Sequence, residues 1–202
     1  MSDVLDLWKY EKEAREEGYR MIAGTDEAGR GPLAGPVCAA AVILPFGVEI
    51  PGLTDSKKLT EKKREALFPL IQEKALAYAI EFAWVDEIEQ YTILHASQNA
   101  MRRAVEALDP AADYVLVDGN RSDGFSVPDR TIVKGDALSL SIAAASVLAK
   151  VSRDRLMLEY AKTYPGYGFD VHKGYPTKAH YEALRELGPS EIHRPSFLKK
   201  MH

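Results

Sequence analysis

The sequence predicts an α/β fold built on a mixed sheet that is flanked by helices. Short apolar segments alternate with longer segments of helical character, which is the pattern of α/β proteins. The first two apolar segments follow each other directly and predict an antiparallel hairpin. The later ones are interleaved with helices and predict crossover connections, so the sheet is expected to contain both strand directions.

Composition indicates a globular protein. The chain has 202 residues, of which 46% are hydrophobic and 28% charged, so wholesale disorder is excluded. A single cysteine, Cys38, excludes an internal disulfide framework and a thiolate zinc cage. No apolar run has the roughly 18 residues of a membrane span, and the N-terminus lacks the apolar core of a secretory signal. We therefore expect a cytoplasmic protein, and a monomer.

The first half of the chain predicts one helix on each side of a hairpin. Residues 1–18 place Val4 and Trp8 at helical spacing and predict a short N-terminal helical extension. Two apolar segments bounded by glycine and proline then predict buried strands, at 20–25 and at 36–44. Thr60 is the expected N-cap of a helix over 61–76.

The second half predicts the remaining strands and the long helices. The segment 77–85 alternates and predicts a third strand, and Asp86 is expected to cap a helix that ends before Asp109-Pro110. The remaining elements are strands at 114–117 and 131–134, a long helix at 138–163, an aromatic loop, a helix at 177–187 and a tail. We divide the chain into the extension 1–18, a catalytic domain 19–163, and a substrate-contacting loop, helix and tail 164–202.

Acidic residues follow three of the predicted strands. Asp26 and Glu27 end the first, Asp118 the fourth, and Asp136 follows the fifth. Functional groups of open α/β sheets collect outside strand ends. Four converging carboxylates would repel one another without cations, and hard oxygen ligands suit Mg²⁺ or Mn²⁺. Each aspartate alone is more often a simple turn residue, so the prediction rests on the set of four.

Asp26 and Glu27 are adjacent, which raises a geometric question. In a regular strand their side chains face opposite sides of the sheet. We therefore expect the strand to end or bulge between them, and the flexible segment that contains Gly29 and Gly31 favours this. In that segment, Gly29-Arg30-Gly31 also offers close backbone approach and a guanidinium for phosphate, although such turns are common.

Two further segments are candidates for nucleic-acid contact. Residues 55–64 (DSKKLTEKKR) gather cationic side chains that favour a phosphate backbone, and a solvated helix start is an equal alternative. The segment 164–180 interleaves aromatic and cationic residues, which can stack on nucleotides, although most such aromatics pack on the protein body. Zinc binding by His172 and His180 is a weaker interpretation, since no acid or cysteine pattern accompanies them.

Five blocks of the sequence together resemble bacterial type-2 ribonuclease H, the ribonuclease HII family. They occur in the family's order over about residues 20–197 and read TDEAGRGPLAGPV, DSKKLTEKKRE, YVLVDGN, KGDALSLSIAAASVLAKVSRD and YPGYGFDVHKGYPTKAH. The resemblance implies a ribonuclease H-like fold with a central mixed five-stranded sheet. It implies a metal-dependent endonuclease that cleaves RNA in RNA–DNA hybrids and incises 5′ to single ribonucleotides in duplex DNA. If a metal-activated water attacks the phosphorus and the 3′-oxygen leaves, the products carry 5′-phosphate and 3′-hydroxyl ends.

The resemblance also implies site residues. The family's catalytic, metal-binding carboxylates fall on Asp26, Glu27, Asp118 and Asp136, which would hold two divalent ions, Mn²⁺ or Mg²⁺. Its ribose-reading motif falls on Gly29, Arg30 and Gly31, and Ser56 and Lys57 match phosphate contacts. Its substrate-sensing tyrosine best matches Tyr175, with Tyr167 close by.

The sequence leaves two other functions open. A nuclease of the same fold that acts on DNA junctions would share the carboxylates, and a non-catalytic nucleic-acid-binding module would not need them. The formal net charge of −4 weakly opposes a nucleic-acid partner. However, four of the negative charges belong to the predicted metal site, and cations gather at residues 57–64 and at the C-terminal end.

Overall fold

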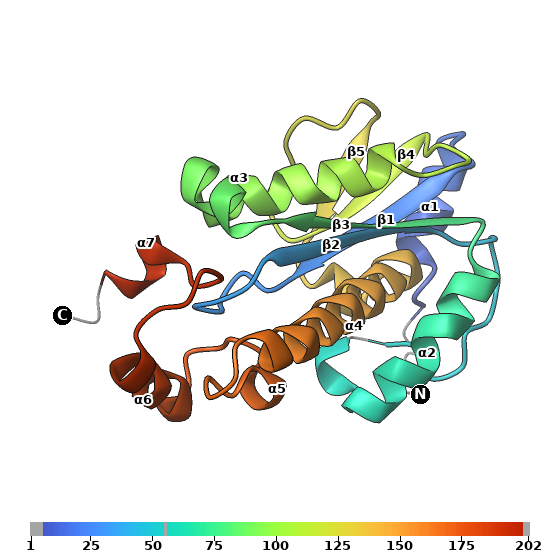
Figure 1. The fold of residues 1–202 in the computed structure, drawn as a ribbon. Coiled ribbons are helices and arrows are strands. Elements are labelled where there is room, and N and C mark those ends of the chain that lie inside the picture. Colours follow the sequence, from blue (N-terminus) through green and yellow to red (C-terminus); the bar gives the residue numbers. More distant parts are fainter. Residues whose placement is uncertain (1–5, 55, 200–202) are drawn as a thin grey trace.

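The protein, as a computed structural model, folds around one mixed sheet with helices on both faces (Figure 1). The structure describes residues 6–54 and 56–199. The helices are α1 (Lys9–Glu16), α2 (Glu61–Lys74), α3 (Val85–Glu106), α4 (Leu140–Thr163), α5 (Phe169–His172), α6 (Lys178–Leu187) and α7 (Pro195–Leu198). The strands are β1 (Ile22–Ala28), β2 (Val37–Ile43), β3 (Ala77–Ala83), β4 (Tyr114–Asp118) and β5 (Asp129–Ile132).

The sheet has the order β3-β2-β1-β4-β5. The pairs β1–β2 and β2–β3 are antiparallel, and β1–β4 and β4–β5 are parallel. The predicted hairpin and crossovers are therefore confirmed, and with them the mixed five-stranded sheet. None of the helices in the described ranges is both long and apolar enough to cross a membrane.

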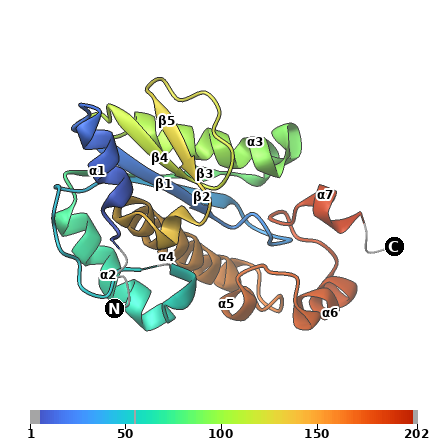
Figure 2. The ribbon, with the colours of Figure 1, turned by 180° about the vertical axis from the view of Figure 1, so that it is seen from behind.

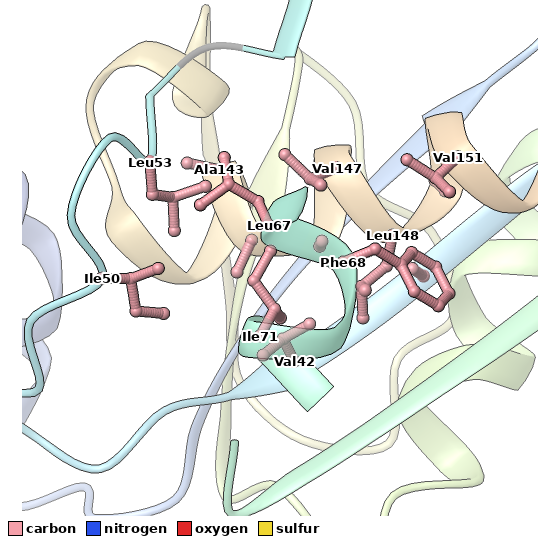
Figure 3. Close-up of a cluster of buried hydrophobic side chains, with 14 of the residues drawn as sticks. Val42, Ile50, Leu53, Leu67, Phe68, Ile71, Ala143, Val147, Leu148 and Val151 are labelled. Carbon is pink, nitrogen blue, oxygen red and sulfur yellow. The ribbon is translucent and has the colours of Figure 1, made fainter. Parts of the chain in front are cut away.

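The strand β2 is buried on both faces because α3 covers one side of the sheet and α4 the other (Figures 1 and 2). Cys38, Ala40 and Val42 pack with α2 and α4, whereas Ala39 and Ala41 pack with α3. Figure 3 shows the first of these clusters, in which Val42 lies among side chains of α2 and α4. Small residues on the strands let the helices approach closely: a Cβ at Gly24 of β1 would lie only 2.2 Å from the backbone of Ser141 in α4.

Several predicted boundaries are wrong in detail. Strand β5 ends at Ile132, two residues earlier than expected, so Asp136 lies in a separate 3₁₀ turn, Gly135–Ala137. Asp86 lies inside the first turn of α3, whose N-cap position is Trp84. Thr60 does cap α2, because its hydroxyl accepts a hydrogen bond from the backbone N–H of Lys63 at 3.3 Å.

The N-terminal helix α1 docks on the beginning of α4. Glu11 is buried, and its carboxylate accepts hydrogen bonds from the Ser139 hydroxyl at 2.6 Å and from the Ser141 N–H at 3.0 Å. An anionic group at a helix N-terminus is stabilised by the helix dipole. Burial nevertheless raises the pKa of Glu11. Val4, part of the predicted pattern, lies outside the described residues.

The C-terminal elements α5, α6 and α7 gather at one end of the molecule, beside the β1–β2 connection (Figure 1). Phe169, Leu184 and Ile192 form a small core there together with Leu33 and Ala34 of that connection. The tail therefore packs against this core, through Phe197 and Leu198.

Candidate active site

A pocket of ≈ 270 Å³ opens where β1 and β4 end. These two strands pair in parallel as far as Thr25 and Val117, so Asp26 and Asp118 follow at the same edge of the sheet. The pocket is lined by Asp26, Glu27, Ala28, Gly29, Arg30, Gly31, Ser56, Arg64, Asp118, Ser146, Lys150 and Tyr175. The structure thus brings together residues from segments far apart in the sequence.

The prediction that the strand ends or bulges between Asp26 and Glu27 is wrong. β1 continues in regular register, with Asp26 opposite Ala40 and Glu27 opposite Ala39. The two side chains therefore leave opposite faces of the sheet. Asp26 is buried on the side of α4, and Glu27 also lines a second pocket beside α3. Both reach the first pocket because pairing with β4 stops at Thr25, which opens the sheet edge from either side.

Asp136 joins the site through Asp118. Its backbone N–H donates a hydrogen bond to Oδ1 of Asp118 at 3.3 Å, and Asp136 is itself buried. Gly135 permits this approach, since a Cβ there would lie 3.3 Å from the same oxygen and 2.6 Å from Ile142. The turn places Asp136 beside the pocket but not among its lining residues.

The charges at the site favour a bound cation. Burial, followed by the negative charges of Glu27 and Asp118, raises the pKa of Asp26 well above its usual range. In the part of the chain that the structure describes, no group of three or more acidic, histidine or cysteine side chains meets the geometry of a metal site. The donor chemistry nevertheless fits a divalent ion, because oxygen ligands are what Mg²⁺ and Mn²⁺ prefer and a cation would relieve this repulsion.

The two glycines of the Gly-Arg-Gly segment have different surroundings. Gly29 has φ +101°, and a Cβ there would lie 2.0 Å from Nε of the buried Arg153. At Gly31 the nearest atom to such a Cβ is Cε1 of Tyr175 at 3.7 Å, so this glycine faces the pocket. Arg30 lies between them, half exposed, with its guanidinium 3.4 Å from a Glu27 carboxylate oxygen.

The structure places Tyr175, and not Tyr167, at the pocket. Tyr175 is 37% exposed, and the cationic groups of Lys150 and Arg153 lie 5.6 and 5.7 Å from its ring centroid. Tyr167 is buried in the C-terminal core, stacks on Phe169, and donates a hydrogen bond from its hydroxyl to the Gly188 carbonyl at 2.7 Å.

The cationic segment lies only partly at the pocket. Ser56 is buried, and its hydroxyl pairs with that of Ser146. Arg64 donates hydrogen bonds to the carbonyls of Ser56 and Leu59, so it stabilises this turn. The side chain of Lys57 is outside the described part of the structure.

The histidines of the aromatic segment are buried and hydrogen-bonded to the backbone. His172 Nε2 donates to the Tyr167 carbonyl at 2.7 Å, and His180 Nδ1 donates to the Tyr175 carbonyl at 2.9 Å. The two rings stack with centroids 4.3 Å apart.

Sequence reasoning missed several residues at and behind the pocket. Ser146 and Lys150 line it from α4, and their spacing of four places them on one helix face, a pattern that the Ala-rich background could have revealed. Arg153 and Arg194 are fully buried behind the pocket. No local pattern distinguishes such arginines from exposed ones.

Comparison with known proteins identifies the family. The family model described as Ribonuclease HII matches residues 23–200. The chain belongs to the ribonuclease HII family. A Ribonuclease HII from Geobacter sulfurreducens is 56% identical over 191 residues, which are 95% of this chain and 88% of that protein. Membership supports an endoribonuclease that acts on RNA–DNA hybrids and depends on divalent metal ions.

Solved structures agree on the fold. The ribonuclease H2 of Pyrococcus horikoshii OT3 has a TM-score of 0.74 at 25% identity and covers 88% of this chain and 93% of its own. A Bst-RNase HIII solved in complex with Mn²⁺ has a TM-score of 0.59 at 20% identity, over 87% of this chain and 65% of its own. The ribonuclease H-like fold that the sequence resemblance implied is therefore confirmed.

Proposed function

We propose that this enzyme, besides cutting RNA in hybrids, incises duplex DNA on the 5′ side of single embedded ribonucleotides, leaving 5′-phosphate and 3′-hydroxyl ends. The observation that carries the proposal is the composition of one pocket. Carboxylates suited to metal ions line this pocket, and so do Gly31 and Tyr175, which are neighbours in its wall.

The carboxylates Asp26, Glu27, Asp118 and Asp136 would hold two divalent ions, Mg²⁺ or Mn²⁺. A Bst-RNase HIII of the same fold was solved with Mn²⁺, which favours this assignment. The chemistry that two such ions supply when bound is activation of a water and stabilisation of the leaving 3′-oxygen. Burial and the negative charges of Glu27 and Asp118 make the ionised form of Asp26 costly, and a bound cation would offset that cost.

The Gly-Arg-Gly segment and Tyr175 would select the sugar. The 2′-hydroxyl is what distinguishes one ribonucleotide within DNA. A Cβ at Gly31 would lie 3.7 Å from Cε1 of Tyr175, in contact with the ring, so the absence of a side chain leaves the Gly31 backbone open to a ribose edge beside the tyrosine. Arg30 is exposed enough to meet an adjoining phosphate. Since these groups contact sugar and phosphate, little base preference is expected. Lys57 and Ser56 are proposed as further phosphate contacts.

The cellular setting completes the proposal. We infer a cytoplasmic monomer, in keeping with a free, buried thiol at Cys38. Its partners would be RNA–DNA hybrids and duplex DNA that contains ribonucleotides.

A nicking assay tests the function. A labelled DNA duplex with one ribonucleotide is incubated with the enzyme and Mn²⁺ or Mg²⁺, beside an all-DNA duplex and a four-way DNA junction. We expect one nick 5′ to the ribonucleotide and none in the all-DNA duplex. Cleavage of the junction alone would identify a junction nuclease, and binding without cleavage under either metal would identify a non-catalytic module.

A further inference from the structure

The segment Ser190–Arg194 is hydrogen-bonded to the connection that carries the Gly-Arg-Gly segment and, through His180, to the loop that carries Tyr175. The backbone N–H of Gly35 donates to the Ile192 carbonyl, and that of Arg194 donates to the Leu33 carbonyl, both at 2.8 Å. Ala34 and His193 form an isolated antiparallel bridge. The tail thus adds a short extended pairing to the connection that carries Gly29 and Gly31.

Arg194 fixes one of these loops. It is fully buried, and its guanidinium donates to the carbonyls of Gly29 at 2.7 Å, Arg30 at 3.0 Å and Gly35 at 2.7 and 2.9 Å. These bonds hold the backbone of Gly29 and Arg30 from the side away from solvent. A planar, multidentate donor is needed for this, so lysine is not an equivalent replacement.

His193 connects to the other loop. The backbone N–H of Ser190 donates to His193 Nδ1 at 2.9 Å, which makes Nδ1 an acceptor and places the proton of the neutral ring on Nε2. Nε2 of His193 donates to Nε2 of His180, with the two nitrogens 3.0 Å apart. His180 in turn donates from Nδ1 to the Tyr175 carbonyl at 2.9 Å. This series of hydrogen bonds begins at a backbone N–H and ends at a backbone carbonyl. The ring proton is therefore on Nε2 in His193 and on Nδ1 in His180.

We propose that His193 and Arg194 are positioning residues, which together set the distance between the Gly-Arg-Gly segment and Tyr175. Neither lines the pocket. Arg194 holds the Gly-Arg-Gly side of the pocket, and His193 holds the Tyr175 side through His180. The two are adjacent in the chain, so one short segment contacts both sides. This inference rests on the proposed function, since it assigns to these two sides of the pocket the task of seating the ribose.

The test measures kcat and KM on the single-ribonucleotide duplex at saturating Mn²⁺. We expect Arg194→Lys, which keeps the charge but not the fork, to lower kcat at least tenfold with KM changed less than threefold, because misaligned reacting groups slow the chemical step. The control is Tyr167→Phe, which removes the hydroxyl bond to Gly188 in the same C-terminal core but keeps the ring beside His193 and the carbonyl that His172 binds. Its melting temperature should fall while kcat stays within twofold.

A double-mutant cycle separates positioning from general weakening and does not depend on the folding of the arginine variant. His193→Gln should lower kcat about tenfold in the native background and less than twofold when Tyr175→Ala is already present, because the tyrosine is then no longer there to be aligned. Equal losses in both backgrounds, or native kcat in both positioning variants, would overturn the proposal. Nicking by the native enzyme with unaffected variants refutes the positioning alone, whereas no nicking by the native enzyme refutes the proposed function and this inference with it.

Discussion

Acid should destabilise this protein through His193. The ring is 2% exposed, and burial together with the neighbouring His180 lowers the pKa of His193 from 6.5 to about 4. The imidazole also uses Nδ1 as an acceptor and Nε2 as a donor, an arrangement that only the neutral ring can make. A second proton, on Nδ1, would therefore place a charge in a buried environment and would face the Ser190 N–H that now donates to Nδ1.

The sign and size of the effect follow from proton linkage. Between pH 6.5 and 4 the unfolded chain binds a proton at this position and the folded chain does not, so stability falls as the pH falls. The full contribution is present above pH 6.5. With these two pKa values, His193 alone costs about 2 kcal/mol between pH 7 and pH 5. Burial also lowers the pKa values of His172 and His180, so their contributions have the same direction.

The assay is urea unfolding from pH 8 to pH 5 with a chelator present. We compare the pH dependence of the unfolding free energy for the native protein, for His193→Gln, and for His95→Gln as a control at an exposed histidine. The glutamine at 193 should flatten the curve by about 2 kcal/mol between pH 7 and pH 5, whatever it costs at neutral pH. The reasoning is refuted if His193→Gln and the native protein lose stability in parallel.

Three further predictions concern the site and the core. Asp118→Asn should abolish cleavage of the hybrid, and gel-shift binding should be largely retained, since the substitution removes a proposed metal ligand but leaves the surface intact; metal-dependent turnover by this variant would contradict the assignment. Gly29→Ala should lower the unfolding free energy by about 2 kcal/mol or more, because the added Cβ meets Arg153 and the residue has a positive φ. Gly31→Ala should change the unfolding free energy by less than about 0.5 kcal/mol and lower the activity instead. Equal melting temperatures for the two variants would refute this. Ile71→Ala should cost about 2–5 kcal/mol by leaving a cavity in the cluster of Figure 3, measured by urea unfolding with a native catalytic rate per folded molecule as the control.

Local sequence signals were enough to identify the kinds of element and the set of chemical groups. Apolar segments bounded by glycine and proline predicted β1 and β2, and Thr60 marked the start of α2, because these signals act through local backbone geometry and hydrogen bonding. The acidic residues near three strand ends could be recognised without knowing how the strands pair.

How those groups come together depends on the packing of distant segments. Asp26 and Glu27 share a pocket because the pairing of β1 with β4 stops at Thr25. The end of that pairing depends on both strands, so the sequence of neither strand alone predicts it. In the same way, Tyr175 and Tyr167 lie in similar local sequence, and only packing of the C-terminal elements puts one at the pocket and the other in the core. Arg194 is 165 residues away from the Gly29 carbonyl that it binds. Every residue has a backbone carbonyl, so the sequence around Gly29 carries no sign that an arginine binds it. The path of the chain brings the two together.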